Sequence, residues 1–351
     1  MGNWESYVRK VVPYVPGEQP AQENIIKLNT NENPYPPAPG VAAALEQMKS
    51  DKLRKYPDPN CRILVDAIAE NYGLKSDQVF VGVGSDDVLA MIFLTFFNGE
   101  APIIFPDITY SFYDVWADML RIPYDKKPLD NNFRIIKEDY YGENGGVIFP
   151  NPNAPTGIYM ELSEVEEIIQ HNSDVIVVID EAYIDFGGTS ALSLIEKYDN
   201  LLVVQTFSKS RSMAGMRIGF AMGNEKLIRY LNDVKYSFNS YTMDETALVL
   251  GVAAIRDKVY FEETCQKIIK TREWTKGELR KLGFTFGDSK SNFIFAAHER
   301  VPAKELFEAL KKEGIYVRYF AKPRIDNYLR ISIGTDDEMG KMVKFLQKYI
   351  K

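Results

Sequence analysis

The stretch TFSKSRSMAGMRIGF, residues 206–220, begins inside the apolar run LLVVQTF and decides how the chain is interpreted. That run is typical of a buried strand, and Lys209 comes two residues after it. Thr206 and Ser208 add hydroxyl groups beside the lysine, and Arg217 follows eight residues later. An amine at the end of a buried strand can form an imine with a carbonyl compound, and an arginine is a fork-shaped donor for phosphate. The stretch therefore predicts the two ends of one binding site.

Outward from this stretch, apolar runs alternate with helical patterns over most of the chain. The runs are VFVGVG (79–84), APIIFP (101–106), GGVIFP (145–150), VIVVID (175–180) and LLVVQTF (201–207). Continuous Val/Ile-rich strands separated by helices indicate a buried, mostly parallel sheet with helices on both faces. We expect a large α/β domain at residues 41–250 and a smaller α+β domain formed by residues 1–40 and 251–351.

The composition limits the classes of protein to consider. The 351 residues carry a formal net charge of −7 and are 45% hydrophobic and 26% charged. This acidic balance argues against nucleic acid or an anionic membrane as the main partner. Two distant cysteines and two histidines predict neither a disulfide framework nor a metal cluster. The longest apolar stretch, residues 88–97, is too short to span a bilayer. From these features together we expect a cytoplasmic protein without bound metal.

Polar side chains follow the predicted strands, at the edge of a parallel sheet where ligands bind. Asp180 ends one apolar run and Tyr183 comes three residues later, while Tyr110 follows another run. A glycine-containing turn before Ser85 and Asp86 opens a helix, whose free N–H groups suit a phosphate. Each residue also has an ordinary structural explanation, such as a helix cap for Asp180 or packing for Tyr110. Because all of these residues are expected at the same edge of the sheet, we favour one binding site formed by them together.

Together these motifs resemble a known family over nearly the full length of the chain. The resemblance is carried by KLNTNENPYPP (27–37), KYPDPN (55–60), GVGSDD (82–87), NPNAPTG (151–157), VIDEAYIDF (178–186), TFSKSRSMAGMRIGF and YLRISIGT (328–335). The chain resembles the fold-type I, pyridoxal-phosphate-dependent aminotransferases, and most closely the histidinol-phosphate aminotransferases. The resemblance implies an aspartate-aminotransferase-like fold.

The resemblance also implies roles around pyridoxal 5'-phosphate. Lys209 is expected to attach to the aldehyde of this cofactor and later to move the substrate proton. Asp180 is expected to pair with the ring nitrogen, Tyr183 with the ring oxygen, and Tyr110 to stack on the ring. The phosphate is expected to contact Ser85, Asp86, Thr206, Ser208 and Arg217.

Substrate contacts and the assembly follow from the same resemblance. Arg318 and Arg330 match family arginines that bind the anionic ends of the two substrates. The N-terminal arm is expected to close over the substrate with Asn33 and Tyr35 near it. Tyr56 is expected to reach the cofactor phosphate of a neighbouring subunit, which implies a homodimer.

One departure from the family pattern affects the ring oxygen. Many members carry Asn-Asn-Pro-Thr-Gly, whereas this chain has Asn153 and then Ala154 before the proline. If the contact belongs to the residue directly before the proline, this chain lacks it. We assign the contact to Asn153 instead.

The implied reaction is transamination between L-histidinol phosphate and 2-oxoglutarate, which gives imidazole-acetol phosphate and L-glutamate in histidine biosynthesis. Aromatic amino-acid aminotransferases and threonine-phosphate decarboxylases share the fold and many motifs, so both stay open as alternatives. A non-catalytic, ligand-sensing regulator is an alternative from another class. Such proteins usually carry a helix-turn-helix ahead of the domain, and here residues 1–40 are rich in Pro and Asn instead.

Overall fold

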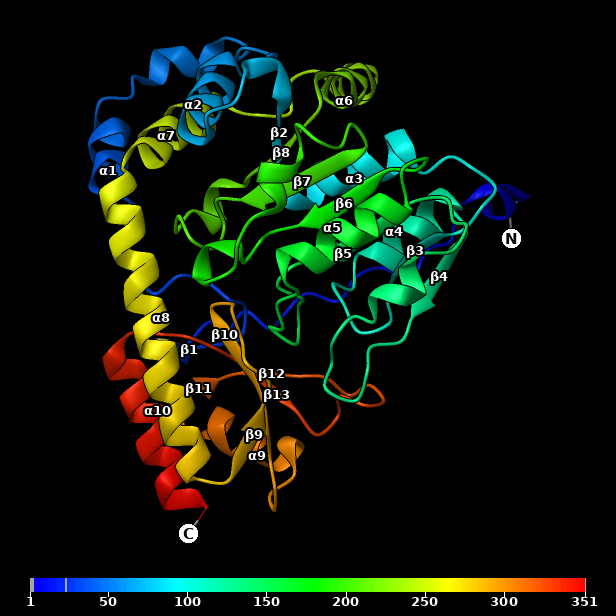
Figure 1. The fold of residues 1–351 in the computed structure, drawn as a ribbon. Helices are drawn as coiled ribbons and strands as arrows, with labels where there is room; N and C mark the ends of the chain where they lie inside the picture. The colour runs from blue at the N-terminus through cyan, green and yellow to red at the C-terminus, as the bar shows by residue number, and fades with distance from the viewer. Residues whose placement is uncertain (1–2, 23, 351) are drawn as a thin grey trace.

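The computed structural model describes residues 3–22 and 24–350, and a seven-stranded sheet lies at its centre (Figure 1). From edge to edge the strands are β2 (Val79–Val83), β8 (Ile218–Gly223), β7 (Leu201–Thr206), β6 (Val177–Asp180), β5 (Val147–Pro150), β3 (Ile103–Pro106) and β4 (Tyr124–Lys127). Only β8 runs antiparallel to its neighbours. The prediction of a mostly parallel sheet in an α/β fold is confirmed.

Helices cover both faces of this sheet, as its apolar strands require. One face packs against α1 (Pro39–Glu46), α2 (Arg62–Tyr72), α5 (Leu162–His171) and α7 (Glu245–Arg256), and the other against α3 (Gly84–Phe96), α4 (Tyr113–Leu120) and α6 (Glu225–Phe238). Along β7, Leu201 and Val203 join the first core while Leu202 and Val204 join the second. This alternation follows from the two-residue period of a strand, and it explains why β7 has no polar face.

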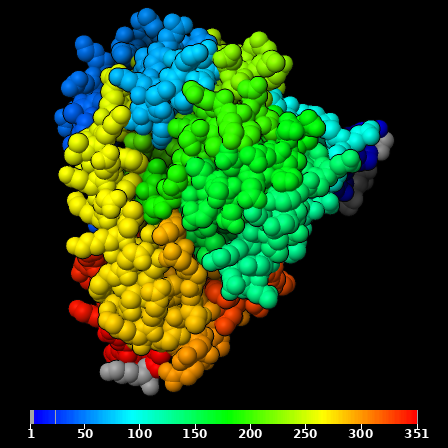
Figure 2. Space-filling view, in the orientation of Figure 1, coloured from blue at the N-terminus to red at the C-terminus, as the bar shows by residue number. Residues whose placement is uncertain are grey.

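The C-terminal part of the chain builds a second, smaller core. The long helix α8 (Lys258–Lys281) runs from the large sheet's helices down to this core, and its atoms form a yellow strip along one side of the molecule (Figures 1 and 2). The core lies around a four-stranded antiparallel sheet in the order β12-β13-β10-β9, covered by helices. Its elements are β9 (Phe284–Phe286), β10 (Phe293–His298), α9 (Ala303–Lys312), β12 (Arg318–Tyr319), β13 (Leu329–Ser332) and α10 (Asp336–Tyr349).

The N-terminal arm joins this second core through a short parallel pair. Strand β1 (Ile26–Lys27) pairs with β11 (Ile315–Tyr316), and Leu28 packs among the buried residues of the core. Residues 26–28 of the arm therefore contact the C-terminal part, while the domain division at residues 41–250 stays a prediction. The connections carry the 3-10 helices η1 (Asn3–Tyr7), η2 (Ser50–Arg54), η3 (Ser76–Gln78), η4 (Lys137–Tyr140), η5 (Ile184–Phe186), η6 (Ala191–Leu194) and η7 (Ala214–Met216).

The described residues contain neither a membrane-spanning helix nor a metal-binding cluster. Among residues 3–22 and 24–350, no helix has both the length and the apolar character needed to cross a bilayer. In the same part of the chain, no group of His, Cys, Asp and Glu side chains is arranged to hold a metal ion.

Candidate active site

A cavity of about 160 Å³ lies beyond the carboxyl ends of β6 and β7. Because β2 and β3 run in the same direction as these strands, the turns that follow them reach the same edge. Nine predicted residues line the cavity: Ser85, Asp86, Tyr110, Asp180, Tyr183, Thr206, Ser208, Lys209 and Arg217. The other lining residues are Thr30, Glu32, Pro150, Ala154, Ala182 and Ala214.

Lys209 supplies the amine of this cavity. It follows the buried end of β7, and its Nζ donates to the carbonyl oxygen of Thr30 at 3.3 Å. The same nitrogen lies 5.8 Å from the centre of the Tyr183 ring. In the described part of the chain no carboxylate forms an ion pair with Lys209. A lysine amine without such a partner is available to react with a carbonyl group.

Asp180 supplies a buried carboxylate. Its Oδ2 accepts a hydrogen bond from the Tyr113 hydroxyl at 2.9 Å, and its Oδ1 accepts one from the Ala182 N–H at 3.2 Å. Burial raises the pKa of Asp180 to about 6, although both hydrogen bonds oppose this shift. No cationic side chain is within ion-pair distance of it among the described residues. A buried carboxylate of this kind is stabilised by a cationic ligand.

Tyr183 is held at its hydroxyl and at its ring. The Asn31 side-chain amide donates to the Tyr183 hydroxyl at 2.9 Å. The ring of Phe293 stands edge-on to the Tyr183 ring, with centroids 5.1 Å apart. The phenol therefore has a fixed orientation at the cavity wall, with its hydroxyl proton free to be donated.

The opposite end of the cavity suits a phosphate. Arg217 forms an ion pair with Asp86 at 3.0 Å, and its Nη1 is 3.5 Å from the Ser208 hydroxyl. Asp86 also accepts a hydrogen bond from the Tyr110 hydroxyl, and burial together with Asp86 raises the pKa of Tyr110. Gly84, with φ +83°, begins α3 here, and a Cβ on it would lie 2.5 Å from Arg217 Nη2. Only glycine lets the arginine approach the helix N-terminus this closely.

A second cavity of about 470 Å³ adjoins the first and contains both predicted substrate arginines. Lys209, Tyr183 and Tyr110 line both cavities. Arg330 donates from Nη2 to the Asn29 carbonyl at 2.9 Å, but its Nε is buried and has no hydrogen-bond partner in residues 3–22 and 24–350. Neither Arg318 nor Arg330 forms an ion pair with a carboxylate of the described chain.

Electrostatics favours an anion between these two arginines. Burial, together with the positive charge of Arg318, lowers the pKa of Arg330. The ring of Phe320 lies 5.5 Å from the Arg318 guanidinium carbon and 5.6 Å from that of Arg330. Two like charges over one ring repel each other, and a doubly charged oxyanion would offset that repulsion.

Four predicted residues do not line either cavity. The Tyr56 side chain is 83% exposed, and its ring packs on Tyr241 with centroids 4.7 Å apart. Asn153 is buried, and its amide donates to the Ile108 carbonyl and to Thr156. The other two residues belong to the arm: Asn33 donates to the carbonyls of Lys209 and Ser210, and the Tyr35 ring lies below Lys267.

Three residues that the sequence did not single out contribute to the site. Tyr113 bonds to Asp180, and Asn31 bonds to Tyr183. Tyr14 lines the second cavity, and its ring stacks on Phe112 with centroids 4.2 Å apart. Tyr113 comes three residues after Tyr110 and begins α4, so helical spacing could have predicted that the two side chains lie close together. Nothing in the local sequence indicates the long-range contacts of the two arm residues.

Comparison with known proteins identifies the family. The model of the aminotransferase class I and II family matches residues 23–346. The chain belongs to the class I and II aminotransferases. It is 52% identical over 349 residues to histidinol-phosphate aminotransferase from Lactococcus lactis subsp. cremoris (strain SK11), covering 99% of this chain and 98% of that protein. It is 51% identical over 347 residues to the protein of the same name from Clostridium botulinum (strain Langeland), with coverages of 99% and 98%. The predicted family resemblance is confirmed.

Solved structures share the fold of this aminotransferase. The histidinol-phosphate aminotransferase of Clostridium acetobutylicum superposes with a TM-score of 0.85 at 24% identity, covering 93% of this chain and 99% of that one. The enzyme of the same name from Sinorhizobium meliloti, in complex with pyridoxal-5'-phosphate, gives 0.84 at 23% identity, with coverages of 93% and 90%. An L-threonine-O-3-phosphate decarboxylase from Porphyromonas gingivalis gives 0.80 at 18%, with coverages of 93% and 99%. Fold alone therefore does not separate transamination from decarboxylation.

Proposed function

We propose that this aminotransferase moves the amino group of L-histidinol phosphate to 2-oxoglutarate, giving imidazole-acetol phosphate and L-glutamate in histidine biosynthesis. The observation that carries the proposal is the pair Arg318 and Arg330, which share a cavity with Lys209 and lack a carboxylate partner in the described chain. Both a phosphate and a dicarboxylate offer an oxyanion to these arginines at different half-reactions. Full-length relatives named histidinol-phosphate aminotransferase support the phosphorylated donor.

We propose pyridoxal 5'-phosphate as the cofactor, because the residues of the first cavity fit its three functional ends. Asp180 offers a buried carboxylate to a cationic ring nitrogen, Lys209 an amine to the aldehyde, and Arg217 a guanidinium to the phosphate. Tyr110 would stack on the pyridine ring of the cofactor, and Tyr183 would lie near the oxygen of that ring. When bound, the cofactor supplies an electron sink for the carbanion at the substrate Cα. The other phosphate donors are Ser85, Asp86 through its backbone N–H, Thr206 and Ser208.

The protein side chains supply orientation and proton transfer. Lys209 Nζ would take the proton from the substrate Cα and deliver it to the former aldehyde carbon of the cofactor. Asp180 acts in its ionised form, which the Tyr113 hydroxyl and the Ala182 N–H favour by donating to it. Tyr183 would donate its hydroxyl proton to the ring oxygen, while the Asn31 amide donates to the Tyr183 hydroxyl and fixes its orientation.

The remaining predicted residues act through segments that line the site. Asn33 holds the arm against the Lys209 loop by donating to two carbonyl oxygens of that loop. Tyr35 packs the same arm against the small core. Asn153 holds the turn that presents Ala154 to the cavity, since its side-chain amide and oxygen bond to neighbouring groups.

We propose a homodimer in which Tyr56 completes the partner's phosphate site. Its exposed ring packs on the ring of Tyr241, and the nearby Leu53 and Phe238 are also largely exposed. Mixing inactive Tyr56→Ala and Lys209→Ala proteins should restore activity, because a mixed dimer contains one complete site. Two buried free cysteines, Cys61 and Cys265, support a place in the reducing cytoplasm.

Donor selectivity tests the proposed reaction. With 2-oxoglutarate as acceptor, we expect kcat/KM for L-histidinol phosphate to exceed that for L-histidinol by about 100-fold or more, since a buried charge contact contributes about 2–5 kcal/mol. L-Phenylalanine and L-tyrosine should react more slowly. Rapid turnover of the aromatic amino acids with no reaction of the phosphorylated donor would refute the substrate. Release of carbon dioxide from O-phosphothreonine would favour the decarboxylase.

A further inference from the structure

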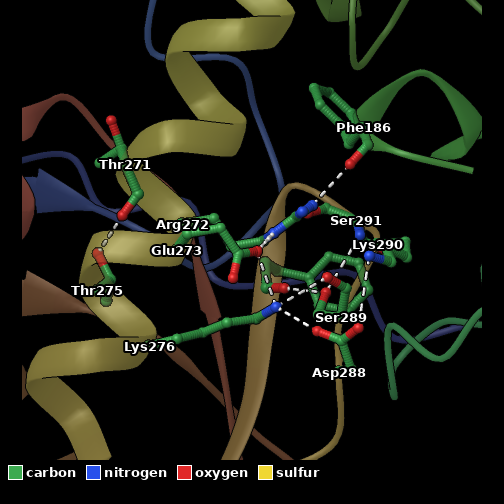
Figure 3. A network of polar contacts seen from close by, with 11 residues as sticks. Phe186, Thr271, Arg272, Glu273, Thr275, Lys276, Asp288, Ser289, Lys290 and Ser291 are labelled. Carbon is green, nitrogen blue, oxygen red and sulfur yellow. Dashed lines mark hydrogen bonds and ion pairs between the residues drawn. The ribbon is translucent and has the colours of Figure 1, made fainter.

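Two buried cations on α8, Arg272 and Lys276, lie outside both cavities. They are one helical turn apart, and their exposed fractions are 2% and 0%. Their carboxylate partners Glu273 and Asp288 keep 50% and 68% of their side chains exposed. Burying a cation is costly unless hydrogen bonds replace its water, so surface ion pairs alone do not explain these positions. Figure 3 shows both side chains directed at residues 288–291, which belong to the loop before β10 (residues 287–292).

Lys276 holds the beginning of this loop. Its Nζ donates to Asp288 Oδ1 at 2.7 Å and to the Ser289 carbonyl at 3.2 Å. A third bond goes to Glu273 Oε1 at 2.9 Å, so all three ammonium protons have acceptors. The ammonium group therefore ties α8 to the loop through the backbone as well as through a carboxylate (Figure 3).

Arg272 connects the loop to the segment that carries the active-site tyrosine. Its Nη1 donates to the Ser291 carbonyl at 2.9 Å and to the Phe186 carbonyl at 2.7 Å. Phe186 ends η5 (Ile184–Phe186), which starts directly after Tyr183. One guanidinium nitrogen thus joins the end of the loop to the backbone three residues beyond the phenol.

The next two residues connect the loop to Tyr183, Asn292 through Asn31 and Phe293 directly. Asn292 donates from Nδ2 to the Asn31 carbonyl at 2.9 Å, and Asn31 in turn donates to the Tyr183 hydroxyl. Phe293 stands edge-on to the Tyr183 ring. The contacts form a closed ring that starts and ends at Tyr183 and passes through Arg272.

We propose that Arg272 and Lys276 are positioning residues that fix the Tyr183 phenol in the cavity. The inference rests on the proposed function, in which Tyr183 donates to the ring oxygen of the cofactor. That hydrogen bond stabilises the deprotonated form of the lysine-bound chromophore, so a misplaced phenol raises the pH at which its absorbance titrates. Loosening the loop acts on the hydroxyl through Asn31 and on the ring through Phe293.

The experiment titrates the absorbance of holoenzyme variants between pH 5 and 10. Lys276→Met removes the loop anchor while leaving its two carboxylate partners in water, so this variant is expected to fold. Its titration midpoint should rise by about 0.5–1 unit, since a hydrogen bond contributes about 1 kcal/mol and one unit equals 1.36 kcal/mol. Its kcat should fall about tenfold, while KM for the oxo-acid acceptor should change by less than about twofold. Arg272→Met should show a larger shift, and Arg272→Lys should recover part of it.

Two controls separate positioning from general loss of stability. Leu346→Ala empties part of the same small core on α10, and Lys281→Met removes the ion pair between the exposed Lys281 and Glu278 on α8. Both should keep the wild-type midpoint, although Leu346→Ala lowers the melting temperature. An unshifted midpoint in Lys276→Met and Arg272→Met, or an equal shift in Leu346→Ala, overturns the inference. Failure of the wild-type holoenzyme to react with L-histidinol phosphate contradicts the proposed substrate only, because the midpoint comparison needs no substrate.

Discussion

Removing the Tyr113 hydroxyl tests how this chain keeps its catalytic carboxylate ionised. Asp180 has a pKa of about 6 because burial outweighs the two hydrogen bonds that it accepts. The Tyr113 bond is 2.9 Å long and fully buried. A hydrogen bond to a charged group contributes about 1.5–3 kcal/mol, and 1.36 kcal/mol equals one unit. Tyr113→Phe should therefore raise the pKa of Asp180 by about one to two units.

The assay is the affinity of the apoenzyme for pyridoxal 5'-phosphate between pH 5 and 9. Ionised Asp180 favours a cationic ring nitrogen, so affinity should decline where Asp180 becomes protonated. The ionisable groups of the cofactor titrate in the same way with every variant. The ratio of the variant Kd to the wild-type Kd therefore reports the titration of Asp180 alone. This ratio should be close to one at about pH 9, where Asp180 is ionised in both proteins, and should rise as pH falls toward 6, the pKa of Asp180 in the wild type.

Tyr140→Phe is the matched control for this prediction. Tyr140 is buried against Phe149 of β5, but its hydroxyl has no hydrogen-bond partner among the described residues, so removing it breaks no bond to a charged group. The control should follow the wild-type curve. Superimposable curves for Tyr113→Phe and Tyr140→Phe would show that the hydroxyl does not stabilise the ionised carboxylate.

Three further substitutions probe the substrate end, a buried acid and a contact between segments. Arg330→Gln should lower kcat/KM for L-histidinol phosphate by about 100-fold in steady-state assays but affect L-histidinol little; equal losses would contradict phosphate binding. Burial raises the pKa of Glu181 to about 7, from 4.5 in the unfolded chain. The folded protein therefore holds this proton more tightly than the unfolded chain does. The resulting contribution to stability is complete below pH 4.5 and is lost as pH rises through 7. Glu181→Gln should therefore flatten the fall in melting temperature between pH 5 and 8, and an unchanged slope would refute this. Arg324→Gln removes an ion pair with Asp107 at 2.9 Å and hydrogen bonds to two backbone carbonyls, so the free energy of unfolding in urea titrations should fall by about 1–3 kcal/mol, and an unchanged value would refute this.

The sheet and the strand-end residues could be predicted because both follow from local pattern. Continuous Val/Ile runs specify strands buried on two faces, and a parallel sheet brings the carboxyl ends of those strands to one edge. Asp180, Lys209 and Tyr110 were found by this rule alone. The family resemblance then supplied a chemical role for each of them.

Side-chain directions in irregular segments could not be predicted. No periodicity governs the turn around Asn153 or the arm around Asn33, and backbone carbonyls compete for their amides in both places. Tyr14 and Asn31 reach the cavities through contacts more than 90 residues away in sequence. A single sequence does not encode such pairs in any local pattern.

An absorbance titration of the purified holoenzyme tests the central claim most directly. Addition of L-histidinol phosphate should convert the absorbance of the lysine-bound cofactor to that of its amine form, and 2-oxoglutarate should restore it. Lys209→Ala should show no such cycle, because the proton at the substrate Cα has no acceptor of the right geometry. Absorbance of the wild-type enzyme that stays unchanged with the phosphorylated donor, or a complete cycle in Lys209→Ala, would contradict the account.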